Sequence, residues 1–275
     1  MNGIKPIRLS PITKRYIWGI EEWLLSGLHP GFEQTSLLIK RIVANDALSI
    51  QVHPNDAYAE DKEASCGKTE MWYVLDCEPE AFLYYGLKHQ VSGNEFLKRI
   101  QNGTITEICN KVKVKKGDVF YIPAGLVHAI GKGITVLEVQ QNSDITYRVY
   151  DYEREDINHC KRELHIKQAA EVAEFVPPLQ GHRPMGVCHK RKEYEKTLLV
   201  QCPYFTVHHY CIKSDIRLKQ KTKYMNIYVS DGMGEIRMEN EIVPLNRGDC
   251  IFVPSKIKEI EIAGKVELLI SEVPG

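Results

Sequence analysis

The sequence has no long apolar run and no excess of charge of one sign. None of its hydrophobic stretches approaches the ~20 residues that a membrane-spanning helix needs, and the amino terminus shows no signal-peptide pattern. Lysine plus arginine and aspartate plus glutamate each number 36, so the charge balance does not favour nucleic acid or an anionic membrane as a partner. We therefore expect a cytoplasmic globular protein.

Closely spaced pairs of cysteines are also absent. The chain has eight cysteines, none of which forms a Cys-x2-Cys pair of the kind found in structural zinc motifs. In a chain of this length without a secretory signal, we expect reduced and mostly buried thiols. Cys66 lies close in sequence to a candidate metal ligand, so exposure would make this one thiol reactive.

Four side chains that can bind a metal occur in the first half of the chain. Gln51 and His53 stand two residues apart, which places them on the same face of a strand. Glu70 begins an apolar run, and His128 ends a Gly-x5-Pro-x-Gly-x2-His segment. A single His is more often a structural strand residue than a ligand, but turn-forming Gly and Pro before His128 favour a ligand at the mouth of a barrel. Two imidazoles, a carboxylate and an amide suit a divalent metal such as zinc and leave room for substrate.

Four segments carry a resemblance to a known family. The run from Gly117 to His128 resembles the second conserved motif of the cupin superfamily, whose small β-barrels hold a metal. The Gln-x-His-Pro segment that starts at Gln51, the segment Lys68–Trp72 and the segment Asn142–Arg148 resemble type I mannose-6-phosphate isomerases. The resemblance is close over about the first 155 residues and loose over the remainder. It implies two cupin-like, jelly-roll β-barrels.

The length of the first half points to one branch of this family. Only 57 residues separate Glu70 from His128. The large helical insertion of the longer members has no room there, so the chain is similar to the short bacterial branch.

The resemblance also implies an activity and the residues that perform it. The reaction would be zinc-dependent interconversion of mannose 6-phosphate and fructose 6-phosphate through an enediol(ate), with one zinc per chain. Arg148 would enter the site as the essential cation, and Lys68 would lie close to the substrate. Glu138 and Asp144 would take part in proton transfer. The alternative for Arg148 is a surface strand position among alternating charges.

The distribution of apolar residues predicts a mainly β protein. Short segments rich in Val, Ile, Tyr and Phe are bounded by turn-forming residues, and the expected strands are 71–75, 119–122, 135–139, 224–229 and 250–253. A helix is expected over 92–102, where Ser92 and Glu95 form a capping box and Gly103 can end the helix. A second helix is expected from 166 to about 175, before a linker that contains two adjacent prolines.

An internal repeat predicts two related domains. Residues 116–123 and 247–254 share a basic-Gly-Asp turn, an apolar strand and a proline, which is typical of a duplicated supersecondary unit. After Pro254 the Gly and the His that would supply a ligand are missing. The expected domains are a catalytic metal-binding cupin over 1–160, a helix and linker over 161–184, and a degenerate, metal-free cupin over 185–275.

Two other classes of function stay open. One is a metal cupin with different chemistry, such as another sugar isomerase or a dioxygenase, although iron oxygenases usually have a His-rich ligand set and the amide of Gln51 disfavours oxygen activation. The other is a non-catalytic sugar-binding or regulatory bicupin, since a fold does not guarantee an activity. Retention of all four ligands and Arg148 argues against this second class. The expected partner is a small-molecule sugar phosphate, and the oligomeric state is open.

Overall fold

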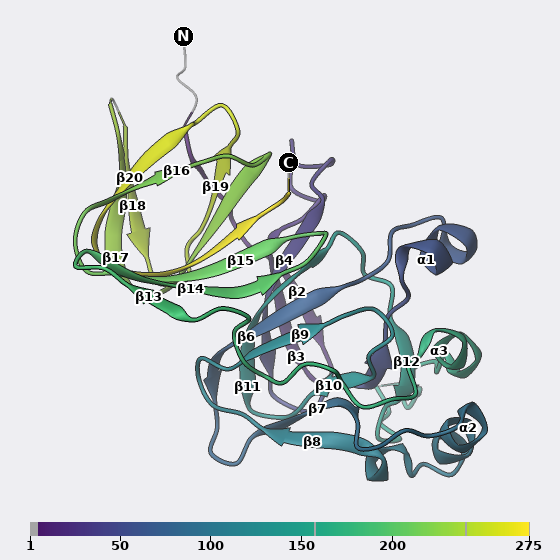
Figure 1. Ribbon diagram of the computed structural model, residues 1–275. Helices are drawn as coiled ribbons and strands as arrows, with labels where there is room; N and C mark the ends of the chain where they lie inside the picture. Colours follow the sequence, from purple (N-terminus) through teal and green to yellow (C-terminus); the bar gives the residue numbers. More distant parts are fainter. Residues whose placement is uncertain (1–4, 157, 240, 275) are drawn as a thin grey trace. The chain divides into compact units, whose positions relative to one another are not determined.

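The computed structural model describes residues 5–156, 158–239 and 241–274 of the chain, and strands are the main regular structure of these residues, with three α-helices (Figure 1). They form two compact units. One unit is Thr13–His182, and the other combines the chain from Arg183 onward with the described residues up to Ile12. The mainly β class that the sequence predicts is confirmed, as is the cupin-like fold.

The unit Thr13–His182 contains two antiparallel sheets. The six-stranded sheet has the order β2 (Ile12–Tyr16), β3 (Gly19–Leu25), β4 (Leu37–Ala44), β11 (Ile134–Gln141), β6 (Glu70–Cys77), β9 (Val119–Ile122). The five-stranded sheet has the order β12 (Tyr147–Tyr150), β5 (Ile50–Val52), β10 (His128–Ile130), β7 (Phe82–Leu87), β8 (Cys109–Lys113). One apolar core takes Trp72, Phe120 and Val136 from the first sheet and Leu83 and Ile130 from the second. The two sheets therefore pack face to face, as in a jelly roll.

Three helices cover the other face of the five-stranded sheet. They are α1 (Asp56–Glu63), α2 (Gly93–Gln101) and α3 (Ile166–Val172). Phe96 of α2 and Ala169 of α3 pack in one apolar cluster with Val52 of β5 and Val149 of β12. The capping of α2 agrees with the sequence, because Ser92 Oγ accepts a hydrogen bond from the Glu95 amide at 3.1 Å. The prediction for α3 was three residues too long, since the backbone turns extended at Ala173.

The second unit is built on one nine-stranded sheet. Its main order is β1 (Ile7–Arg8), β19 (Cys250–Pro254), β17 (Tyr224–Met238), β20 (Glu259–Glu272), β15 (Thr206–Ile212), β14 (Tyr194–Gln201), β13 (Cys188–Lys190), with β16 (Ile216–Lys219) beside β20 and β18 (Glu241–Asn246) beside β17. Its apolar core includes Ile227, Ile251 and Leu268. Because β1 pairs with β19, the described residues up to Ile12 belong to this unit and not to a domain that starts at residue 1.

The repeated turn has the same geometry in both units. Gly117 and Gly248 adopt positive φ angles of 90° and 92°, a conformation that favours glycine. In each unit the strand after the turn pairs with β6 or β17, and a valine of that partner strand exchanges two backbone hydrogen bonds with the turn. The distances are 2.9 and 3.0 Å with Gly117 and Asp118, and 2.8 and 2.9 Å with Gly248 and Asp249. The repeat read from the sequence is therefore a structural repeat.

Candidate metal centre

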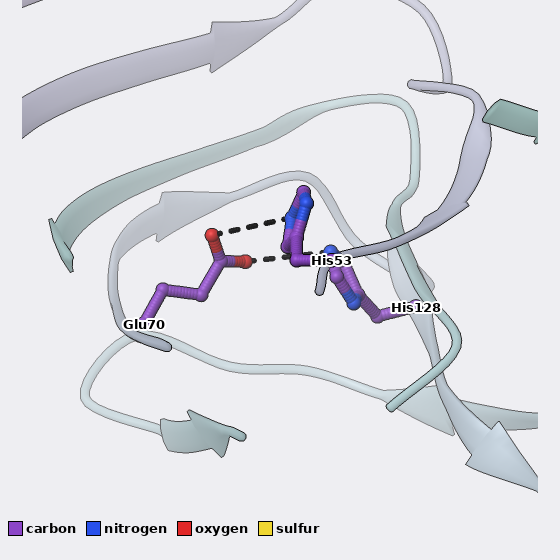
Figure 2. Close-up of side chains that lie close together, drawn as sticks. All are labelled: His53, Glu70 and His128. Carbon is purple, nitrogen blue, oxygen red and sulfur yellow. Dashed lines mark ion pairs between the residues drawn. The ribbon is translucent and has the colours of Figure 1, made fainter. Parts of the chain in front are cut away.

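Strands from both sheets bring the candidate ligands together inside the unit Thr13–His182. Gln51 lies in β5 and His53 follows its end, while Glu70 and His128 begin β6 and β10. The ligand atoms of His53, Glu70 and His128 all lie within 4.8 Å of one another. Figure 2 shows the carboxylate of Glu70 turned toward the two imidazoles.

The site lies deeper than the sequence predicted. Glu70 and His128 are 0% exposed and His53 is 1% exposed. We expected His128 at the mouth of the barrel, but the strand β10 that it begins lies between β5 and β7 and the ring lies in the interior. The site is therefore shielded from bulk solvent, which strengthens the interaction of its charged groups.

Hydrogen bonds fix the tautomer of both imidazoles. Nδ1 of His53 lies 2.8 Å from the Ile145 carbonyl oxygen, and Nδ1 of His128 lies 2.7 Å from the Leu126 carbonyl oxygen. A carbonyl only accepts hydrogen bonds, so Nδ1 carries the proton in each ring and Nε2 presents a lone pair. The Nε2 atoms of His53 and His128 lie 3.5 and 3.4 Å from the carboxylate oxygens of Glu70 (Figure 2).

Two imidazole lone pairs therefore face the carboxyl group of Glu70. Among the described residues, His53 Nε2 and Glu70 Oε1 are buried without a hydrogen-bond partner, an arrangement that costs free energy unless a cation lies between them. Burial lowers the pKa of His128 to about 4, so the ring is neutral. Burial and the charge of Glu138 raise the pKa of Glu70 to about 8, although Lys68 Nζ lies 3.0 Å from its Oε2. A divalent metal would satisfy all three groups and favour the ionised carboxylate.

Gln51 lies beside this group. Its Nε2 atom is 3.4 Å from His128 Nε2, and its Oε1 atom accepts a hydrogen bond from Ser49 Oγ at 3.5 Å. Turning the amide by 180° exchanges these two atoms and brings the oxygen next to His128. The donor set is then two neutral nitrogens, one carboxylate and one amide oxygen, which fits zinc.

A cavity of about 250 Å³ adjoins the candidate ligands. All three tryptophans of the chain line it, namely Trp18, Trp23 and Trp72. The four residues for which the sequence suggested catalytic roles line it too: Lys68, Glu138, Asp144 and Arg148. The structure therefore brings every candidate site residue into one place.

The sequence reasoning missed a buried lysine in this cavity. Lys40 Nζ lies 3.2 Å from Glu138 Oε2 and 3.7 Å from Glu21 Oε2. Trp72 Nε1 donates to the other oxygen of Glu138 at 2.8 Å. Burial opposes ionisation of Glu138, but the ammonium groups of Lys40 and Lys68 hold its pKa at about 2. The available signal was a lysine within the otherwise apolar run Leu37–Ile39 and Ile42–Ala44 of β4.

Arg148 and Asp144 occupy different environments. Arg148 is half-buried in β12, and its Nη1 donates to the Glu163 carbonyl oxygen at 2.7 Å. Its Nε is buried without a hydrogen-bond partner among the described residues. A second guanidinium, of Arg162, lines the same cavity and is held by Asp151 at 2.7 Å. Asp144 is exposed, so it meets solvent as well as the cavity.

The second unit lacks the corresponding polar groups. Met225 occupies in the second unit the position that Glu70 occupies in the first, because both lie opposite the same position of the repeated strand. On the next strand of each sheet, Ile270 corresponds in the same way to Glu138. Met225 and Ile270 are buried in the apolar core of that unit. A thioether and an alkyl chain thus replace the two carboxylates, as expected for a degenerate copy.

The cysteines differ from the expectation. All eight are free thiols, but only Cys109 and Cys250 are buried, while Cys160 and Cys188 are exposed. The prediction of mostly buried thiols was wrong, because several lie on outward-facing or loop positions. Burial raises the pKa of Cys66, so this thiol is a weak nucleophile at neutral pH.

Comparisons with known proteins agree with this architecture. Residues 195–273 match a family model described as mannose-6-phosphate isomerase, cupin domain. The chain is 40% identical over 239 residues to the mannose-6-phosphate isomerase ManA of Bacillus subtilis, covering 86% of this chain and 75% of that protein. It is 40% identical over 236 residues to the mannose-6-phosphate isomerase of Streptococcus mutans, covering 86% and 73% of the two chains.

Solved structures give the same result. A crystal structure of the mannose 6-phosphate isomerase from Bacillus subtilis has a TM-score of 0.90 at 32% identity, covering 98% of this chain and 99% of that chain. A zinc-bound mannose 6-phosphate isomerase shares the fold with a TM-score of 0.73 at 14% identity, covering 98% and 100%. In the described part of this chain, no helix combines the length and apolar character needed to cross a membrane. Because the chain is 40% identical to two curated relatives over 75% and 73% of their length, it belongs to the mannose-6-phosphate isomerase family.

Proposed function

We propose that the protein interconverts mannose 6-phosphate and fructose 6-phosphate, with one zinc ion bound by Gln51, His53, Glu70 and His128. The observation that carries this proposal is the meeting of two imidazole lone pairs and a carboxylate in a buried cluster. A divalent cation would satisfy such a cluster, and the cluster adjoins a cavity lined by acidic and basic side chains. Membership of the family supplies the substrate class.

The residues of the cavity account for the chemistry of a 1,2-proton shift. When bound, zinc supplies a Lewis acid that polarises oxygens of the substrate. Glu138 is ionised and held in place by Trp72 and Lys40, so it can take the proton from C2 of mannose 6-phosphate and return it to C1. Asp144, which reaches solvent, completes the exchange of protons with water.

Two cations stabilise the charge that develops between these proton transfers. Removal of the proton from C2 places negative charge on the oxygens of an enediolate. Lys68 and Arg148 line the cavity, and the Nε–H of Arg148 has no acceptor among the described residues. A guanidinium stays charged at physiological pH. Arg148 therefore stabilises the enediolate without competing for the proton.

A coupled assay of fructose 6-phosphate formation from mannose 6-phosphate tests the proposal. Activity should disappear when a chelator removes the metal and return when zinc is added. Zinc-loaded protein that converts no mannose 6-phosphate would favour the non-catalytic bicupin. Conversion of a different sugar phosphate in preference to mannose 6-phosphate would favour an isomerase of other specificity.

A further inference from the structure

The segment between α3 and the second unit is more than a linker. Residues 173–182, here called the strap, belong to the compact unit Thr13–His182. In Figure 1 the chain leaves α3 and runs past β10 and β9 of this unit. The expected linker over 161–184 gave this segment no role at the metal centre. One of its contacts falls on Gly125, just before His128, and another falls on Gly86, whose amide binds the Val127 carbonyl oxygen.

The first contact is at Gly125. The Glu174 amide donates to the Gly125 carbonyl oxygen at 2.8 Å. On its other side, the Gly125 amide donates to the His53 carbonyl oxygen at 2.9 Å. A Cβ at Gly125 would come within 3.0 Å of Glu174 Cγ and 3.1 Å of the Val172 carbonyl oxygen. Glycine at this position therefore lets the start of the strap approach the backbone that links the two histidine segments.

The second contact is at Gly86. The ring of Pro178 packs against this residue so closely that a Cβ there would lie 2.7 Å from Pro178 Cδ. The Gly86 amide donates to the Val127 carbonyl oxygen at 2.8 Å. Pro178 thus presses on the strand residue that holds the backbone directly before His128.

Both ends of the strap are anchored in the same unit. The Phe175 carbonyl oxygen accepts from the Val91 amide at 3.0 Å, and the Phe175 ring lies 5.2 Å from the Phe96 ring. At the other end, His182 stacks on Phe120 of β9, with ring centroids 5.5 Å apart and planes 17° apart. The strap is therefore held at intervals along its length.

We propose that the strap is a positioning element of the metal centre, which fixes Gly125–Val127 and thereby aims Nε2 of His128. The connection is direct, because the Leu126 carbonyl oxygen within this segment binds Nδ1 of His128. Groups that orient a ligating imidazole through its other nitrogen change metal affinity by about 10–100-fold. The inference about metal binding rests on the proposed role of His128 as a ligand. The effect of the strap on the backbone of residues 125–127 does not depend on that role.

Two adjacent prolines offer a matched test. Pro178 is partly buried against Gly86, whereas Pro177 is exposed. We expect Pro178→Ala to weaken zinc binding about tenfold in a competition titration with a chromogenic chelator, while Pro177→Ala binds zinc as the wild type does. In the metal-free protein, Pro178→Ala should also speed hydrogen exchange of the amides of residues 124–128.

A second pair of variants tests the hydrogen bond at Gly125. Glu174→Pro removes the amide donor, and Ala173 already has the extended backbone that precedes proline readily. Glu174→Ala keeps the donor and serves as the control. We expect weaker zinc binding and faster amide exchange of residues 124–128 only in Glu174→Pro. Circular dichroism would verify that each variant folds.

The outcomes separate this inference from the proposed function. Zinc affinity and exchange equal to the wild type in both Pro178→Ala and Glu174→Pro would show that the strap is only a linker. Equal effects of Pro177→Ala and Pro178→Ala would also overturn the inference, because the contact with Gly86 would not matter. Zinc fully retained by His128→Ala would contradict the proposed site instead. The exchange measurement on metal-free protein would still decide whether the strap orders residues 124–128.

Discussion

Gln51 lies directly opposite Arg148 in the pairing of β5 with β12. It also lies opposite His128 in the pairing of β5 with β10. Side chains opposite one another on neighbouring strands share a face of the sheet. An amide, an imidazole and a guanidinium therefore form one row across three strands, and backbone hydrogen bonds fix the spacing between the metal centre and the cation.

Arg148 distinguishes an isomerase from other metal-binding cupins. Arg148→Lys should retain zinc and approximate substrate affinity but lose about 10²–10³-fold in kcat, as expected for removal of one preorganised donor. Arg148→Ala should lose at least as much, with little change in Tm. Steady-state kinetics and a thermal melt measure these effects. Unchanged kcat in both variants would place the non-catalytic bicupin first.

His128 should be essential for metal retention. His128→Ala removes one of the two imidazole lone pairs, so most of the bound zinc and activity should be lost while the fold persists on its own apolar core. His89, which is exposed, provides the control variant His89→Ala with unchanged metal content. Elemental analysis after dialysis makes the comparison. Stoichiometric zinc in His128→Ala would exclude the residue as a ligand.

Zinc binding should release a proton from Glu70. With a pKa raised to about 8 in the metal-free site, this carboxyl is protonated below pH 8, whereas zinc binds the carboxylate. The apparent affinity should therefore fall as the pH falls below 8. His53 and His128 contribute no proton at neutral pH, because burial keeps them neutral.

Titration calorimetry in buffers of different ionisation enthalpy measures this effect. It should give about one proton released per zinc well below pH 8 and fewer above it. Binding heats that do not depend on the buffer at pH 7 would contradict proton release from Glu70.

Lys40 should be important for stability because it neutralises buried carboxylates. Lys40→Met leaves Glu138 and Glu21 without their shared cation, and breaking a buried ion pair from one side costs about 3–5 kcal/mol. Adding Glu138→Gln to Lys40→Met should recover part of the free energy of unfolding without restoring activity. Urea unfolding of the two single variants and the double variant forms the cycle. A loss below about 1 kcal/mol in Lys40→Met would be typical of an exposed pair instead.

Metal should bind only in the unit Thr13–His182. Met225 and Ile270 occupy the positions of the carboxylates in the second unit, so elemental analysis should give one zinc per chain. His208→Ala and His209→Ala should leave this value unchanged. A second equivalent of zinc that either variant removes would show that the second unit has a metal site of its own.

The sequence by itself determined the features that depend on neighbouring residues. The Ser92 cap depends on contacts within one helical turn. The turns at Gly117 and Gly248 need a positive φ angle, and glycine at these positions indicates such a turn. The candidate ligands were readable because Gln51 and His53 obey the two-residue period of a strand. The expectation of a metal-free second unit rests on the Gly and His that are missing after Pro254.

Only the tertiary structure decided what depends on pairing between distant segments. Lys40 meets Glu138 because β4 and β11 pair antiparallel, and a charged residue in a mostly apolar strand does not identify its partner. The depth of His128 follows from its pairing with β5 and β7. The pairing of β1 with β19 and the packing of Pro178 on Gly86 join segments far apart in the chain. Such contacts are selected by the free energy of the whole fold, so no local pattern encodes them.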